Sequence, residues 1–308
     1  MFRLALVFVA LAFSQTPEDL YGAGALSYAQ GRYGQAEHEW RQALAIAGAT
    51  QTSSVPRIQI LVAKALLPQG KFLEAERLLK LALEGMNGSA SDERGKARAL
   101  HALATLYSAV GRQREAEITA ERALEAFHST AGPSDPETAM VLMLLGMLKE
   151  NKGDLSAADR HFLQALTILE PTQSSELPGV WYNLGHLRYS QKKLDEAEHY
   201  FRRTIASERP EHPIVALALE NLALVKLKRG FPAEALALNS EAMALAQKAL
   251  PPGNPSYISM RFNHAKILRA LGRKQEAREL EASTKEAARN TSVDPRLRDR
   301  IDVRTLTR

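Results

Sequence analysis

Hydrophobic and polar positions form pairs of helical patterns along the chain. The stretch from Trp181 to Ala206 shows the arrangement, with two such patterns joined by a short polar break at residues 191–193. Apolar residues that recur every three or four positions predict amphipathic helices. Ala and Leu are abundant and runs of β-branched residues are few, which also favours helix. The pattern therefore predicts an all-α chain.

This two-helix pattern repeats seven times. In each copy a small residue is followed twelve positions later by an alanine, and a larger side chain at either place would push the two helix axes apart. The pairs are Gly24/Ala36, Ala63/Ala75, Ala104/Ala116, Gly146/Ala158, Gly185/Ala197, Ala223/Ala235 and Ala265/Ala277. In six copies a glycine stands five positions before the alanine, where a left-handed residue would end the first helix. In the fifth copy Lys192 holds that place.

The chain resembles the tetratricopeptide repeat (TPR), a helix–turn–helix unit. In the fifth copy the resemblance rests on Trp181, Leu184, Gly185, Ala197 and Phe201, which fall at the spacing of that motif. The alanines of the second helices lie 39, 41, 42, 39, 38 and 42 residues apart, which is longer than the basic TPR period of about 34 residues. This long spacing resembles the TPR type of kinesin light chains.

Three connectors strengthen the resemblance, because each holds a polar residue followed by a proline. They are Asp135-Pro136, His212-Pro213 and Asn254-Pro255. We expect the polar residue to cap the next helix and the proline to take its first position, where a missing N–H costs nothing.

The resemblance implies an all-α fold, an α-solenoid (right-handed superhelix) of about seven TPR units over residues 18–288. Each unit would contribute a first helix, helix A, that lines a concave surface, and a second, helix B, that forms the outer wall. Fourteen helices and no sheet are expected. Residues 289–308 are predicted to be a charged tail or a capping segment.

Residues 1–14 have the outline of a secretory signal peptide. Arg3 precedes an apolar run, and Ala12 and Ser14 are small residues before a possible cleavage site. We therefore expect an exported protein, periplasmic or secreted, with a bacterial envelope as the favoured location. A buried or anchoring first helix is the alternative. The chain has no cysteine, which excludes disulfides and thiol catalysis.

Charge and motifs give no sign of catalysis or nucleic-acid binding. The net charge is +5, and acidic and basic residues are interspersed, which indicates a solvated surface with pairs four residues apart along each helix. The eight histidines form no metal-binding pair, and no nucleophile elbow or phosphate loop is present. We expect no enzyme activity, no cofactor and no metal.

Candidate binding residues lie on the helices A of the fifth to seventh copies. Positions are counted so that the small residue of helix A is position eight. Asn183, Asn221 and Asn263 share position six, where the resemblance implies a hydrogen bond to the backbone of an extended peptide. An amide suits this role because it both donates and accepts. Capping or solvation of the groove by these residues is the alternative. The further candidates in this part of the groove are Tyr182, His186, Tyr189, Lys266 and Arg269.

The fourth copy adds an apolar stripe of Met140, Met143 and Met147. Flexible thioethers suit adaptable apolar binding, and packing against neighbouring helices is the alternative. Together the copies predict a groove that is apolar in the middle and polar, partly basic, toward its C-terminal end. An extended or helical segment with an apolar anchor and an acidic end would fit it.

The sequence thus predicts a non-catalytic, exported scaffold that binds a peptide segment or a partner protein in its concave groove. The alternative is a structural component of an envelope complex that acts through self-association or stacking. We expect a monomer that binds no nucleic acid and has no integral membrane segment once the signal is removed.

Overall fold

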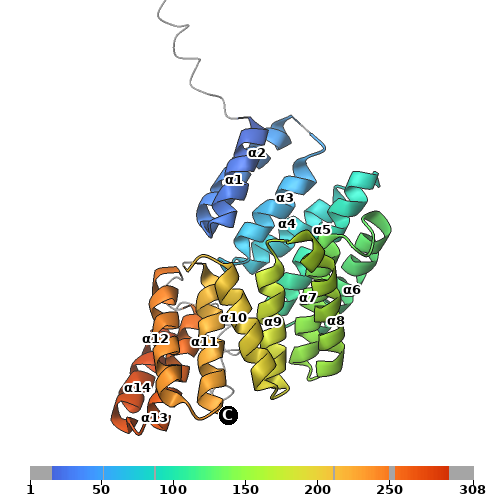
Figure 1. Ribbon diagram of the computed structural model, residues 1–308. Coiled ribbons are helices and arrows are strands. Elements are labelled where there is room, and N and C mark those ends of the chain that lie inside the picture. Colours follow the sequence, from blue (N-terminus) through green and yellow to red (C-terminus); the bar gives the residue numbers. More distant parts are fainter. Residues whose placement is uncertain (1–15, 51, 87, 211, 250–253, 291–308) are drawn as a thin grey trace, which may run out of the picture. The chain divides into compact units, whose positions relative to one another are not determined.

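A computed structural model describes residues 16–50, 52–86, 88–210, 212–249 and 254–290 (Figure 1). Within these ranges the chain forms fourteen α-helices and one short 3-10 helix, and no strand. The expected all-α class and helix number are therefore confirmed for the described part. The predicted signal peptide, and all of the C-terminal tail after residue 290, lie outside the described residues.

The helices fall into two compact units, Met1–Pro133 and Ser134–Arg308. The first unit holds α1 (Pro17–Ala29), α2 (Tyr33–Ala49), α3 (Val55–Leu66), α4 (Phe72–Glu84), α5 (Ala90–Ala109) and α6 (Gln113–Thr130). The second holds α7 (Pro136–Asn151), α8 (Leu155–Leu169), η1 (Glu170–Thr172), α9 (Leu177–Ser190), α10 (Leu194–Ser207), α11 (Pro213–Lys228), α12 (Pro232–Ala249), α13 (Pro255–Ala270) and α14 (Lys274–Asn290). Each odd-numbered helix is a helix A, and it packs against the even-numbered helix B that follows it.

A left-handed residue closes each helix A, as the sequence predicts. The backbone angle φ is positive at all six expected glycines, which are Gly31, Gly70, Gly111, Gly153, Gly230 and Gly272. Lys192 takes the same conformation in the fifth copy, with φ of 64°. The turn geometry is therefore kept even where a side chain makes it unfavourable.

The polar residues of the three connectors cap their helices. Asp135 accepts a hydrogen bond from the backbone N–H of Glu137 at 2.8 Å, and Asn254 accepts one from Ser256 at 2.9 Å. His212 accepts from Ile214 through Nδ1 at 3.3 Å. A proline follows each cap in the first turn of the helix.

The close approach of helices A and B depends on the small residue at position eight. In the two hairpins with a phenylalanine four residues after the helix-B alanine, position eight is glycine. A Cβ added to Gly146 would lie 2.5 Å from the ring of Phe162, and one added to Gly185 would lie 2.7 Å from Phe201. Both phenylalanines are fully buried. The size of the ring therefore requires the glycine.

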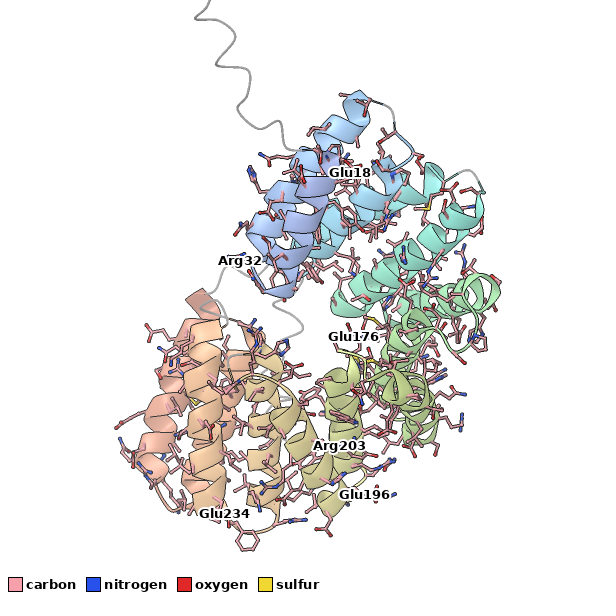
Figure 2. The ribbon with its side chains drawn as sticks, turned by 45° about the horizontal axis from the view of Figure 1, so that its top comes forward. Glu18, Arg32, Glu176, Glu196, Arg203 and Glu234 are labelled. Atoms are coloured by element: carbon pink, nitrogen blue, oxygen red, sulfur yellow. The ribbon has the colours of Figure 1, made fainter. Side chains whose placement is uncertain are left out.

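Charged side chains extend from the hairpins throughout the described residues, for example Glu196 and Arg203 on α10 and Glu234 on α12 (Figure 2). Among the described helices, none is both long enough and apolar enough to cross a membrane.

Candidate functional site

The helices α7, α9, α11 and α13 contact one another in sequence and so form a continuous surface in the second unit. We call the exposed and half-buried side chains of these four helices the A-helix face. All the binding residues expected from the sequence lie on these helices, and most reach the surface at least in part.

Two of the three asparagines at position six link neighbouring helices A. The Nδ2 of Asn221 donates to the carbonyl of Leu217 at 2.9 Å and to the hydroxyl of Tyr182, on α9, at 3.1 Å. The Nδ2 of Asn263 donates to Glu220, on α11, at 2.6 Å. Their amide N–H groups therefore already donate hydrogen bonds within the protein. Their contact with a peptide stays a prediction.

Asn183 differs from the other two asparagines. It is half-buried and has no side-chain hydrogen bond to any described residue. The residue at position five of the preceding hairpin is Met143, which offers no partner comparable to Tyr182 or Glu220. Asn183 is thus the asparagine with the most freedom to bind an outside group.

His186 joins α9 to α7. Its Nδ1 lies 2.8 Å from a carboxylate oxygen of Glu150, and the hydroxyl of Ser190 donates to the same oxygen at 3.0 Å. The hydrogen bond with Glu150 raises the pKa of His186 above its ordinary value. The His186 side chain stays 48% exposed, so it is both structural and accessible.

The two tyrosines of α9 have different surroundings. Tyr182 packs against the ring of Phe201, with 6.1 Å between ring centroids, and burial raises its pKa to about 12. The Nζ of Lys228 lies 4.7 Å from the ring centroid of Tyr189, a cation–π contact between α11 and α9. Tyr189 therefore holds a lysine on the A-helix face.

The methionine stripe is partly buried and partly open. Met140 and Met143 are half-buried, and Met147 is 42% exposed. A Cβ on Gly179 of α9 would come within 3.1 Å of the Cε of Met143, so this residue packs close to the next helix A. Met147 remains as the accessible thioether of the stripe.

The basic residues toward the C-terminal end divide into paired and unpaired groups. Arg269 is bound by both carboxylate oxygens of Glu281, on α14. Lys266 is exposed and has no partner among the described residues, and Lys228 has the Tyr189 ring but no carboxylate. Of the two basic candidates named from the sequence, Lys266 is thus the one without a carboxylate partner among the described residues.

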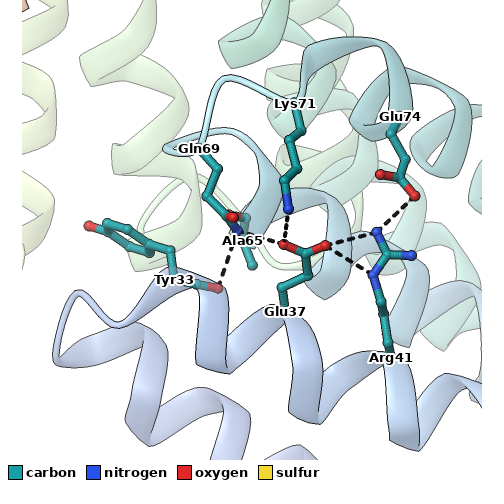
Figure 3. Close-up of polar contacts among 7 residues, drawn as sticks. All are labelled: Tyr33, Glu37, Arg41, Ala65, Gln69, Lys71 and Glu74. Carbon is teal, nitrogen blue, oxygen red and sulfur yellow. Dashed lines mark hydrogen bonds and ion pairs between the residues drawn. The ribbon is translucent and has the colours of Figure 1, made fainter. Parts of the chain in front are cut away.

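Sequence reasoning missed a set of polar links between successive hairpins. Glu37, directly after the helix-B alanine Ala36, is bound by Lys71 at 2.7 Å and by Gln69 at 2.8 Å, both from the next hairpin (Figure 3). Arg41 binds Glu37 within its own helix and Glu74 of the next hairpin. The expectation of pairs four residues apart was therefore incomplete.

The same position carries an acid in the first five copies, namely Glu37, Glu76, Glu117, Asp159 and Glu198. Glu198 binds Arg229 of the next hairpin at 2.7 Å, and Asp159 binds Arg188 at 2.7 Å. An acid at one fixed position of successive copies is the signal in the sequence that could have revealed these links.

The links between hairpins also lower the pKa of Glu37. Burial works to raise the pKa of Glu37, but the hydrogen bonds from Lys71, Arg41 and Gln69 outweigh it and bring that pKa below its ordinary value. Within the described residues, no group of three or more His, Asp or Glu side chains could hold a metal ion.

Sequence profiles of the tetratricopeptide repeat match residues 17–47, 54–129, 178–209 and 214–290. The chain belongs to the tetratricopeptide repeat family. Its repeats are of the kinesin light chain-like type. Protein KINESIN LIGHT CHAIN-RELATED 3 of Arabidopsis thaliana is 24% identical over 249 residues, which is 78% of this chain and 38% of that protein. The chain thus spans about two fifths of the length of the curated relatives it matches.

Solved structures agree on the fold. A kinesin light chain of Podosopora anserina with TPR-like repeats has a TM-score of 0.50 and 22% identity, and covers 62% of this TPR chain and 94% of its own. RapI in its apo form has a TM-score of 0.63 and 16% identity, and covers 89% and 97%. TPR proteins bind protein partners, and their repeats are generally non-enzymatic.

Proposed function

We propose that this TPR protein is a non-catalytic scaffold that binds a peptide segment of a partner protein on the A-helix face of its second unit. The observation that carries the proposal is the pairing of charges on α11 and α13. Lys226, and Arg229 directly after α11, are bound by Glu198 of α10, and Arg269 is bound by Glu281 of α14. Lys228 and Lys266 on the same helices have no carboxylate partner among the described residues.

This distribution favours an acidic partner segment. Two exposed lysines without an internal counter-ion leave a positive potential that steers and selects negative groups. Toward the other end of the face, exposed Met147 offers a soft apolar contact. A segment with an apolar side chain and a following acidic stretch would contact Met147 with the first and the two lysines with the second. Asn183 would bind its backbone between them.

The test uses a library of random dodecapeptides displayed on phage and selected on the immobilised chain. We expect enriched peptides to carry acidic residues together with a large apolar residue. A synthetic peptide of the enriched sequence should bind the Lys228→Ala/Lys266→Ala variant at least tenfold more weakly, because two charge contacts are lost. Lys285→Ala, which removes an exposed lysine from α14, is the matched control and should bind as the parent does.

A second variant tests the backbone contact. Asn183→Ala should weaken the same peptide without changing the salt dependence of binding, because it removes a neutral group. Equal binding by all three variants and the parent would place the peptide site elsewhere on the chain.

We further propose that the protein is exported through its first fourteen residues. The support is the order of Arg3, the apolar run and the small residues at 12 and 14. Expression of the full chain in a bacterium, followed by fractionation and N-terminal sequencing, tests it. A periplasmic product that begins near Gln15 is expected, and an uncleaved cytoplasmic product would refute export.

A further inference from the structure

The contact between the last two hairpins is polar at three positions where the other copies are mostly apolar. The first is position five of helix A, which is Glu220 in the sixth copy. In the other six copies this position holds Tyr21, Ile60, His101, Met143, Tyr182 and Phe262. The second is position seven, where His264 stands and the other six copies have Ala, Val or Leu. The third lies four residues after the helix-B alanine, where Asn239 stands in place of the buried Trp, Leu or Phe of four other copies.

Glu220 is a buried carboxyl without a cation. It is 5% exposed, and its one hydrogen-bond partner among the described residues is the Nδ2 of Asn263 on α13, at 2.6 Å. Glu37, the other buried carboxylate among the described residues, is paired with Lys71 and Arg41.

Asn239 and His264 form the second polar contact of this interface. The Nδ1 of His264, on α13, lies 2.6 Å from the Oδ1 of Asn239, on α12. The Nδ2 of Asn239 donates to the carbonyl of Met260 at 3.3 Å, and Asn239 is fully buried. The last hairpin, α13–α14, is therefore joined to α11 and α12 by side chains whose bonding depends on protonation.

A buried carboxyl that lacks a cation favours its neutral form, because an unpaired charge is costly in a weakly polar surrounding. The amide of Asn263 supplies one hydrogen bond but no charge. Burial accordingly raises the pKa of Glu220 from 4.5 to about 7, and the hydrogen bond from Asn263 offsets this only in part. If the last hairpin separates from α11, Glu220 gains water and its charged form is no longer penalised.

We propose that the hairpin α13–α14 docks on α11 and α12 through a pH-controlled contact, in which ionisation of Glu220 weakens docking as the pH rises through neutrality. This is a property of the interface between two hairpins and does not depend on the identity of any partner. Separation would also change the C-terminal end of the A-helix face, because Asn263 and Lys266 lie on the hairpin that would separate.

The sign follows from the direction of the shift. The docked state holds the proton of Glu220 up to about pH 7, whereas the separated state releases it near 4.5. The added stability is complete below pH 4.5 and is lost as the pH rises through about 7.

Other titratable and charged groups near the interface act differently. Tyr182 of α9 interacts electrostatically with Glu220 and is itself half-buried, and its pKa of about 12 keeps it neutral over this range. Burial, followed by the charge of Arg273, lowers the pKa of His264, while Glu276 works to raise it. His264 therefore opposes docking only at acid pH, as the pH falls through its lowered pKa.

The experiment is amide hydrogen exchange of the full chain between about pH 6 and pH 8.5, with protection corrected for the intrinsic exchange rate at each pH. We expect protection of α13 and α14 to fall on the order of tenfold between pH 6 and pH 8 and then to level off. Protection of α3 and α4, which contain no histidine, serves as the internal reference.

Glu220→Gln keeps the shape and the hydrogen-bond acceptor but cannot ionise, so α13–α14 should stay protected across the range. Glu241→Gln on α12, an exposed glutamate, is the matched control and should follow the parent. A pH-independent parent would overturn the proposal, as would a Glu220→Gln variant that loses protection like the parent. Should the variant fail to fold, the profile of the parent chain alone decides, because a flat profile contradicts the proposal directly.

Discussion

A methyl group on Gly146 would lie 2.5 Å from the ring of Phe162. Non-bonded carbon atoms do not approach so closely without displacement, and both residues are held in helices that pack against each other, α7 and α8. The ring is fully buried and has no free volume to enter. The pair therefore fixes the distance between the two helices of its hairpin.

We predict that Gly146→Ala lowers the stability of the second unit by about 1–3 kcal/mol through overpacking, although alanine is the better helix former. The urea midpoint of unfolding, followed by circular dichroism, measures this. Gly34→Ala on α2 is the control, since an added Cβ there meets nothing within 4 Å. It should raise stability slightly. A loss in both variants would show that the ring contact is not the cause.

The second prediction concerns Lys192, which adopts the left-handed conformation with φ of 64°. Lys192→Gly should raise stability by about 0.5–1 kcal/mol, because glycine removes the steric cost of that conformation. Lys193→Gly, at the neighbouring residue with φ of −85°, should bring no gain. Equal effects at both positions would contradict the strain argument. The melting temperature gives the readout.

The third prediction concerns the first unit and Glu37. Its pKa is held below the ordinary value, so its contribution is present above about pH 4.5 and is lost as the pH falls through the lowered value. Glu37→Gln should cost about 1 kcal/mol at neutral pH and flatten the loss of stability on acidification. Glu84→Gln, at an exposed position of α4, should retain the dependence of the parent. Denaturation at a series of pH values compares them.

The fourth prediction is an order of histidine pKa values. The hydrogen bond with Glu150 raises the pKa of His186, whereas burial lowers those of His161 and His264. A proton NMR titration of the ring signals should show His186 as the last of the three to lose its proton as the pH rises. Glu150→Gln should return its pKa toward the ordinary value of about 6.5. An unchanged titration in that variant would mean that the pair does not form in solution.

The fourth prediction has a consequence for stability. The contact between α7 and α9 through Glu150 and His186 is complete below about pH 6.5 and is lost as the pH rises through the raised pKa. Hydrogen exchange in α9 at pH 6 and pH 9 would detect it.

Much of the fold could be predicted from the sequence, because it is encoded locally. The small residues and the turn glycines act within one hairpin, and their spacing is visible without a structure. Even the exception at Lys192 was placed correctly, since its position is fixed by the neighbouring helices.

The candidate site was predicted less completely, because its contacts join residues about 40 positions apart. The alignment of Asn183, Asn221 and Asn263 was visible, but the sequence did not show that Asn221 and Asn263 donate to Tyr182 and Glu220. Those partners sit at position five of the preceding copy. A carboxylate can have two bases nearby, and the packing of one hairpin against the next decides which of them it binds. Residue spacing within a helix does not reveal this packing.

The acids that follow the helix-B alanines have a consequence for how such a chain can grow. Glu37 and Glu198 each carry one half of a link, and the matching base lies in the next hairpin. A hairpin that carries both an acid and a base brings a complete set of complementary ends. Tandem duplication of the segment that codes for one whole hairpin would therefore create a new interface whose acid and base already match. A duplication or deletion that begins or ends inside a hairpin would instead leave an acid or a base without its partner.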